Sequence, residues 1–240
     1  MRGPAGRRRG SLGTYLPGWY LNDHSSDEAP GQGDVRPNWM PIFLTRYTAI
    51  VDEHADVAVF QDFGHEHVDT FRLAGSRSVL FSVPSLSTAY PRTNPTVRLW
   101  HTLPAQGVVQ DWTQYHMDLI ASNKRHEPLR NVSYTASKEY GLLNLTRPSM
   151  EALLARFKAE SRNASVTSTV YQEERRFFMS STPEKYQPKC DLWCQTTDLC
   201  DKEYGSAPCT EVGFLGCVYW NAHDILRRSS AAGAAAECQK

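Results

Sequence analysis

Residues 41–67 constrain the fold of this chain more than any other stretch. From Pro41 to His54 apolar positions recur at helical spacing, and the run DVAVFQDF that follows has the composition of a buried strand. This strand leads into the motif Gly-His-Glu-His, which places His65 and His67 at its C-terminal end. Ligand sites in α/β sheets favour that end. The sequence therefore predicts an α/β fold with a candidate site at these two histidines.

Other segments extend this pattern. SVLFSVPS and TVRLWHTL are expected to be strands, and GVVQDWTQYHMDLI a strand pair that continues the same sheet. Residues 22–38 are polar and rich in Gly and Pro, which predicts a surface loop. The stretches PSMEALLARFKAES and VTSTVYQEERRFFMSS are expected to be helices.

Composition excludes several classes of protein. The chain has 240 residues, 40% of them apolar, which is enough for a buried core. The 26 basic and 26 acidic residues balance, so nucleic acid is not expected as a partner. No apolar stretch approaches the roughly 20 residues that a membrane-spanning helix needs.

Six cysteines are concentrated near the C-terminus. Their positions are Cys190, Cys194, Cys200, Cys209, Cys217 and Cys238. The spacing fits a zinc ribbon poorly, so disulfides are favoured over a metal site. Three glycosylation sequons, at Asn131, Asn144 and Asn163, also favour an oxidising compartment.

The N-terminus does not fit a secreted protein. MRGPAGRRRG is basic, but SLGTYLPGWYLND lacks the apolar region of a signal peptide. Two explanations stay open: a cytosolic chain with free thiols, or a chain that lacks its true beginning.

The two histidines suggest a metal site. Side chains at i and i+2 of an extended segment share one side, and Gly64 would allow the turn that presents His65 and His67 together. Paired metals of phosphoesterases lie about 3.5–4 Å apart, so each imidazole could bind a different ion. The competing interpretation is a chance H-x-H on the surface. Glu66 is expected to point away from the site and Asp69 could support it, but for both a solvated carboxylate is favoured.

Several motifs together resemble one family. FQDFGHEHVDTF, then VPSLSTAYPRTNPTVRLW, then DWTQYHMDL and CDLWCQTTDLC follow the order and spacing of acid sphingomyelinase-like phosphodiesterases, which are calcineurin-like metallophosphoesterases. The resemblance covers most of residues 12–217. It implies hydrolysis of a phosphodiester, typically sphingomyelin to ceramide and phosphocholine, with two zinc ions per complete site and with His65 and His67 as ligands.

Much of the family's site is missing from this sequence. The motifs D-x-H, G-D and G-N-H-E, which carry the other ligands and the general acid, do not precede the Gly-His-Glu-His motif in the expected order. GTYLPG, residues 13–18, corresponds to G-H-I/V-P-P-G, with Thr14 in place of a metal-binding histidine. Zinc sites need about three or four ligands, so zinc binding by this chain is expected to be weak and the chain inactive alone.

The resemblance also implies an architecture. Residues 1–124 would be the C-terminal half of a metallophosphoesterase layered β-sandwich with flanking helices. Residues 125–218 would be a helical C-terminal subdomain stapled by the disulfides Cys190–Cys194 and Cys200–Cys209, and residues 219–240 a flexible tail. An extracellular or lysosomal location and a phospholipid or other phosphodiester substrate follow from the same likeness.

Two other functions remain open. One is a secreted, non-catalytic binding protein built on the same half-domain, and the other is a cytosolic protein that binds zinc through its cysteines. A membrane-surface contact through Phe177, Phe178 and Met179 is a further expectation, although core packing is favoured for these residues.

Overall fold

The computed structural model describes residues 9–17, 19–22, 34–88, 93–103, 108–161, 169–183, 190, 192–204 and 217. The strands within these ranges are β1 Arg9–Tyr15, β2 Trp19–Asn22, β3 Asp34–Pro37, β4 Ala58–Gly64, β5 Thr70–Ala74, β6 Ser78–Ser82, β7 Thr96–Leu103, β8 Val108–Met117 and β9 Arg130–Thr135. The helices are α1 Pro41–Glu53, α2 Leu119–Arg125, α3 Ala136–Tyr140, α4 Arg147–Ser161, α5 Val170–Phe178 and α6 Leu192–Tyr204. The expected α/β character is confirmed. Within these ranges no helix is long and apolar enough to span a membrane.

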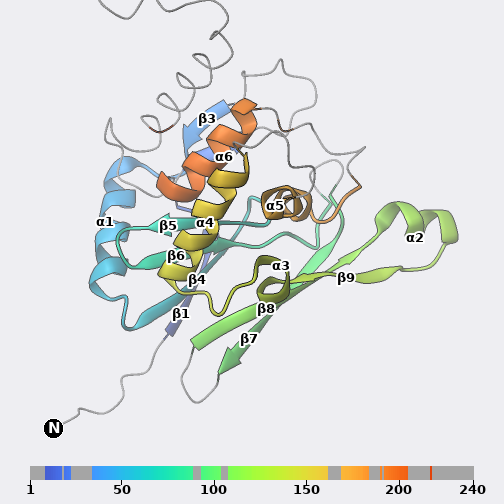
Figure 1. The fold of residues 1–240 in the computed structure, drawn as a ribbon, viewed down its shortest axis with the longest axis horizontal. Helices are drawn as coiled ribbons and strands as arrows, with labels where there is room; N and C mark the ends of the chain where they lie inside the picture. Colours follow the sequence, from blue (N-terminus) through green and yellow to red (C-terminus); the bar gives the residue numbers. More distant parts are fainter. Residues whose placement is uncertain are drawn as a thin grey trace, which may run out of the picture.

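The described strands form a larger mixed sheet, an antiparallel sheet and a short ribbon (Figure 1). The mixed sheet has the order β1-β4-β6-β5, in which β1, β4 and β6 are parallel and β5 is antiparallel to β6. The antiparallel sheet has the order β7-β8-β9, and β2 pairs with β3. Parallel neighbours end at the same edge of a sheet, so β1 and β4 bring their C-terminal ends together.

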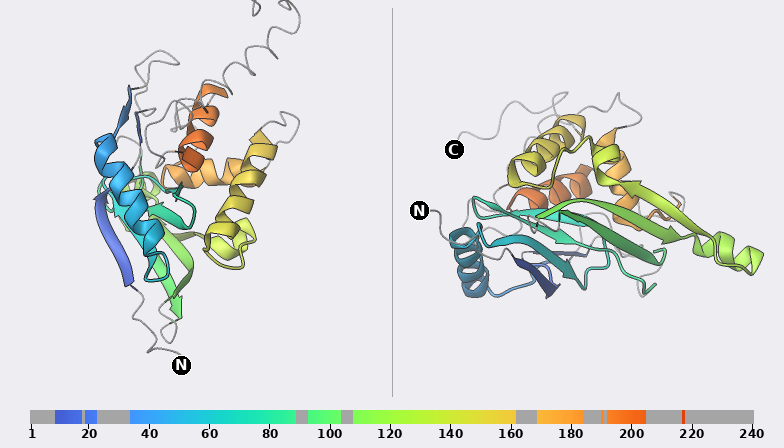
Figure 2. Two further views of the ribbon diagram at one scale, coloured as in Figure 1. Left: turned by 90° about the vertical axis from the view of Figure 1, so that its left-hand side faces the viewer. Right: turned by 90° about the horizontal axis from the view of Figure 1, so that it is seen from below.

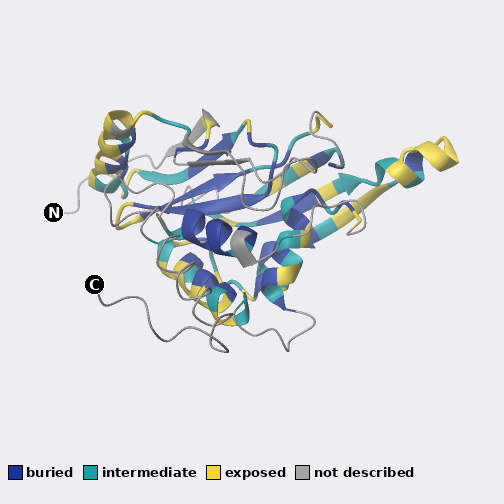
Figure 3. Cartoon of the chain, turned by 90° about the horizontal axis from the view of Figure 1, so that it is seen from above, coloured by how far each residue is buried: buried dark blue, intermediate teal, exposed yellow. Residues whose placement is uncertain are grey.

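Helices lie on both sides of the mixed sheet. The helices α3 to α6 form a layer on one side, and α1 lies on the other (Figure 2). The larger core joins β5, β6, β8 and β9 to the helical layer, and its largest fully buried side chains are Phe157 and Phe177. A smaller core of Leu16, Phe63, Ala74 and Leu80 packs against Tyr47 of α1. Buried residues are thus concentrated where the helices face the strands (Figure 3).

Two expectations about local structure are wrong. Within the predicted strand pair, residues 108–117 form one strand, β8, and α2 follows, because the side chain of Asp118 accepts a hydrogen bond from the Ala121 amide and caps the helix. This strand belongs to the antiparallel sheet and does not continue the mixed sheet. The expected loop at residues 22–38 contains β3, while residues 23–33 lie outside the described ranges.

The C-terminal helices pack as the apolar pattern predicts. Phe177 is 1% exposed and Met179 is 4% exposed, so the preference for core packing over lipid contact holds for these two residues. Phe178 is partly exposed. The expected flexible tail, residues 219–240, lies outside the described ranges.

The cysteines form disulfides. Cys190 is bonded to Cys194, as the resemblance implies, with 5.0 Å between their Cα atoms. Cys200 is bonded to Cys217, so the expected pairing of Cys200 with Cys209 is wrong. The 5.7 Å between the Cα atoms of Cys200 and Cys217 lies within the range that a disulfide spans. Cys209 lies outside the described ranges, and the four bonded sulfurs are not free ligands for zinc.

Candidate functional site

The candidate site begins where β1 lies beside β4. Gly13 is opposite Phe63 and Tyr15 is opposite Gly64, with an irregularity in the register between Gly13 and Tyr15. A Cβ on Gly13 would lie 2.5 Å from Cε1 of Phe63, so only glycine permits this close approach. Residues 13–15 therefore lie next to the start of the Gly-His-Glu-His motif, and position 14 falls at the irregularity in the register.

The two histidines adopt an unusual backbone. His65 has φ of 70° and His67 has φ of 58°, both in the left-handed region. The segment is therefore a turn and not the extended strand that was expected, and the positive φ falls on the histidines and not on Gly64. The amide of Glu66 closes the turn by donating to the Gly64 carbonyl at 2.9 Å. Non-glycine residues rarely adopt this conformation, and they concentrate at functional sites when they do.

The imidazoles differ in their surroundings. His65 is exposed and packs against the ring of Tyr15, with 3.8 Å between ring centroids. His67 is partly buried. Burial and the neighbouring His65 lower the pKa of His67, against the opposing effect of Glu66. A lowered pKa favours the neutral imidazole, which is the form that binds metals.

Glu66 is buried, so the prediction of a solvated carboxylate is wrong. Its side chain accepts a hydrogen bond from Nδ2 of Asn38 at 2.6 Å. Nδ2 of Asn38 also donates to the carbonyl of Leu16 at 3.2 Å. Asn38 thus joins the turn that carries the histidines to the chain that follows β1.

Asp69 is also buried and not solvated. It forms an ion pair with Arg98 of β7, and the side chains of the two residues are 7% and 2% exposed. The Tyr134 hydroxyl of β9 donates to the same carboxylate. Burial raises the pKa of Tyr134 well above its ordinary value, which keeps this donor protonated. Asp69 therefore connects the end of the histidine turn to the antiparallel sheet.

Asp62 is a buried acid that the sequence did not single out. Its Oδ2 atom accepts a hydrogen bond from Nε1 of Trp100 at 3.0 Å, whereas Oδ1 has no hydrogen-bond partner. Burial raises the pKa of Asp62 to about 6, against the opposing effects of Arg98 and of the Trp100 hydrogen bond. The alternation in β4 could have indicated an inward carboxylate, because Asp62 shares its side of the strand with Phe60.

Arg72 connects the site to the C-terminal helix. Its Nε atom pairs with Asp201 of α6 at 2.7 Å, and both side chains are buried. Its Nη1 atom donates to the carbonyls of Pro17 at 3.1 Å and Leu16 at 3.4 Å. Arg72 therefore links the chain that follows β1, at Leu16 and Pro17, to Asp201, which is 129 residues further along the sequence than Arg72.

The described residues do not complete a metal site. They include no group of three or more His, Cys, Asp or Glu side chains placed to hold an ion. His65 and His67 supply two imidazoles, whereas a catalytic zinc site takes about three protein ligands. The donor set therefore fits part of a zinc centre and not a whole one.

The sequons differ in their setting. Asn131 is exposed on β9. Asn144 is partly exposed, and its Oδ1 atom accepts hydrogen bonds from the Thr146 hydroxyl and the Ser149 hydroxyl, both at 2.6 Å. Asn163 lies outside the described ranges, and glycosylation at all three positions stays a prediction.

The geometry defines a mixed α/β protein with two histidines on a strained turn at the end of parallel strands. The chain is 23% identical over 215 residues to sphingomyelin phosphodiesterase B of Dictyostelium discoideum, which covers 84% of this chain and 31% of that protein. It is 26% identical over 171 residues to acid sphingomyelinase-like phosphodiesterase 3b of Homo sapiens, covering 66% of this chain and 35% of that protein. It is also 23% identical over 161 residues to cyclic GMP-AMP phosphodiesterase SMPDL3A of Rattus norvegicus, covering 63% and 34%.

These similarities confirm the resemblance that the motifs indicate. The chain is similar to sphingomyelin phosphodiesterases and acid sphingomyelinase-like proteins, and it fits a C-terminal portion of such a protein. No family model matches it. The chain spans about a third of the length of these relatives.

Proposed function

We propose that this chain is the histidine-bearing C-terminal part of a sphingomyelinase-type phosphodiesterase, and that it is inactive on its own. One observation carries the proposal: the start of GTYLPG, at Gly13 and Tyr15, pairs with the end of the strand that leads into Gly-His-Glu-His. This proximity of two motifs that both resemble metal-binding segments of the family supports the proposal. The relatives support a phosphodiester as the substrate class.

His65 and His67 are the residues that would supply zinc ligands. In a complete centre of this type, zinc polarises the phosphoryl group and provides a hydroxide at neutral pH. This chain's own contribution is to hold two imidazoles in a fixed turn, with His67 kept neutral by its surroundings. The other ligands and the general acid would have to come from polypeptide that this sequence does not contain.

An exposed apolar face on the antiparallel sheet also supports the proposal. On the antiparallel sheet, Val97, Tyr115 and Val132 are directly opposite one another and therefore share one face, and Leu99 lies two residues along the same strand. All four are at least 37% exposed. In a metallophosphoesterase sandwich this face would be covered by the other half of the domain.

The substrate and the compartment follow from the same proposal. Relatives named for sphingomyelin and for cyclic GMP-AMP share the phosphodiester bond, so this bond defines the substrate class for this chain. Two disulfides favour an oxidising compartment, either extracellular or lysosomal. The same compartment would permit glycosylation at the three sequons.

A second candidate is a non-catalytic binding protein. The observation that favours it is Thr14, which stands at the site edge where the family has a metal-binding histidine. A neutral hydroxyl is a weak zinc ligand beside imidazole.

The test is a zinc titration by calorimetry, paired with hydrolysis of bis-p-nitrophenyl phosphate. We expect weak binding by the wild-type chain, loss of that binding in the H65A/H67A double variant, and no hydrolysis by either. The Thr14→His variant should bind zinc more tightly by over tenfold, since even changes around a metal's ligands alter affinity by about 10- to 100-fold. H126A, at an exposed histidine at the end of α2, is the matched control and should leave binding unchanged.

Either of two results would contradict the proposal. Zinc binding that is the same in H65A/H67A and wild type would remove the histidines from the site. A failure of Thr14→His to tighten binding would instead support the non-catalytic candidate.

A further inference from the structure

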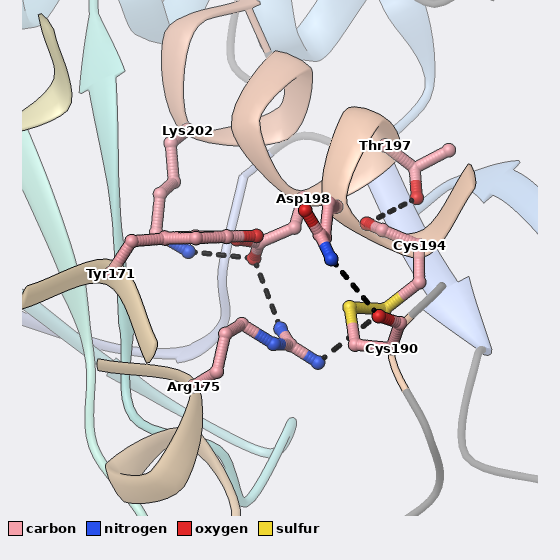
Figure 4. The surroundings of a disulfide bond; sticks show 8 residues. Tyr171, Arg175, Cys190, Cys194, Thr197, Asp198 and Lys202 are labelled. Carbon is pink, nitrogen blue, oxygen red and sulfur yellow. Dashed lines mark hydrogen bonds and ion pairs between the residues drawn. A yellow bond between two sulfur atoms is a disulfide. The ribbon is translucent and has the colours of Figure 1, made fainter. Parts of the chain in front are cut away.

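The Cys190–Cys194 disulfide lies beside a partly buried arginine, Arg175 (Figure 4). Nη2 of Arg175, on α5, donates to Sγ of Cys194 at 3.6 Å. Cys194 is in the first turn of α6, where partial positive charge from the helix amides also favours an anion. Cationic side chains and helix N-termini are the surroundings that stabilise a cysteine thiolate.

The same arginine belongs to a buried charge cluster. Arg175 pairs with Asp198 at 3.3 Å, and Lys202 pairs with Asp198 at 2.6 Å and with Glu174 at 3.0 Å. Burial raises the pKa of Glu174 to about 7, so near neutral pH this acid carries only part of its negative charge. The positive charges of Arg175 and Lys202 then exceed the negative charge of Asp198 and the partly ionised Glu174. A negative charge on Cys194 would balance this excess.

The two residues of this disulfide differ in exposure. Cys194 is 5% exposed, whereas Cys190 is partly exposed and lies outside the helix. The side-chain Nε2 atom of Gln195 donates to the carbonyl of Cys190 at 3.1 Å and holds that residue in place. An external thiol would therefore reach the sulfur of Cys190, and the sulfur of Cys194 would be the leaving group.

We propose that the Cys190–Cys194 disulfide is a thiol-exchange site at which Cys190 is attacked by an external thiolate and Cys194 leaves as a thiolate held by Arg175. The ligand class is a small thiol of the glutathione type. In the first step a bond forms between the external sulfur and Cys190 while the Cys190–Cys194 bond breaks. A second external thiolate then attacks the external sulfur of the mixed disulfide, which yields the external disulfide and a Cys190 thiolate that takes a proton from water.

This exchange moves two electrons from two external thiols to the cysteine pair. Leaving-group thiols that are stabilised as thiolates leave faster and shift the equilibrium towards the reduced form. Because Arg175 bonds both Cys194 and Asp198, reduction would also change the charge balance between α5 and α6. The site depends on neither His65 nor His67.

The experiment is thiol mapping of the full chain. The protein is equilibrated in glutathione buffers of graded ratio, free thiols are alkylated, and each cysteine is quantified by mass spectrometry after reduction and a second, isotopically labelled alkylation. We expect Cys190 and Cys194 to become reduced in less reducing buffers than Cys200 and Cys217. The mixed disulfide with glutathione should be on Cys190 and not on Cys194.

A variant pair isolates the arginine. Arg175→Gln should lower the equilibrium constant for reduction of Cys190–Cys194 by about tenfold, which is about 30 mV for a two-electron couple. Arg176→Gln is the matched control, because Arg176 is the next residue of the same helix, is 54% exposed at its side chain and pairs with Glu173. It should leave the constant unchanged.

Three results would overturn the proposal. These are reduction of both disulfides at the same buffer ratio, a glutathione adduct on Cys194, and equal effects of the Arg175 and Arg176 substitutions. The first two are measured on the wild-type protein, so they hold even if a variant does not fold.

Discussion

Removing the Asp69 carboxylate should destabilise the protein far more than removing an exposed carboxylate. In Asp69→Ala the guanidinium of Arg98, with a side chain 2% exposed, loses its ion-pair partner, and Tyr134 loses its acceptor. Breaking a buried pair by removing one partner costs about 3–5 kcal/mol, because a charge stays buried without compensation. A domain is stable by only about 5–15 kcal/mol, so this loss is a large share of the total.

The control is Asp56→Ala. Asp56 pairs with Arg77, but its side chain is 83% exposed, and exposed pairs contribute about 0–1 kcal/mol. Urea unfolding followed by tryptophan fluorescence is the assay, since the Arg98 guanidinium lies 4.7 Å from the ring centroid of Trp112. Equal losses of unfolding free energy in the two variants would refute the reasoning that burial decides the strength of these pairs.

Three further predictions concern Asp62, Gly13 and the histidine turn. For Asp62 the native pKa of about 6 lies above the unfolded value, so ionisation of this one group removes about 3 kcal/mol of stability as pH rises from about 4 to 7. Over that range Asp62→Asn should therefore lose about 3 kcal/mol less than wild type, measured by urea unfolding at a series of pH values; parallel pH profiles would contradict this. Gly13→Ala should cost about 1–3 kcal/mol through overpacking against Phe63, measured by urea unfolding, and an unchanged midpoint would show that the strands separate freely. His67→Gly should stabilise the fold by about 1 kcal/mol by removing left-handed strain, and a loss of stability would mean that the imidazole's contacts outweigh the strain.

Elements with a local sequence signal could be predicted, whereas features that depend on contacts between distant parts of the chain could not. The helix beginning at Pro41 and the strand at Thr96–Leu103 appear as expected, because apolar periodicity is a local signal. The strand at Thr70–Ala74 was missed, since all five residues are buried and Arg72 interrupts the apolar pattern. The buried arginine is neutralised by an ion pair with Asp201, which is too far away in the sequence for a local pattern to indicate.

The same limit applied to the candidate site. The position of His65 and His67 after a strand could be predicted from composition alone. The burial of Glu66 and Asp69 could not, because it depends on Asn38 and on strands far along the chain. The left-handed backbone of both histidines was also beyond reach, since sequence patterns give no reason to place histidine at positive φ.

Arg72 makes α6 an essential part of the β-sheet region. The arginine is 3% exposed, and a chain cut before Asp201 would keep its positive charge inside the protein without the carboxylate that neutralises it. The carbonyls of Leu16 and Pro17 rely on the same guanidinium, so the cut would loosen the strand end beside the histidines. Expression fragments that stop before α6 should therefore fail to fold, and any study of the histidine turn requires a chain that extends through this helix.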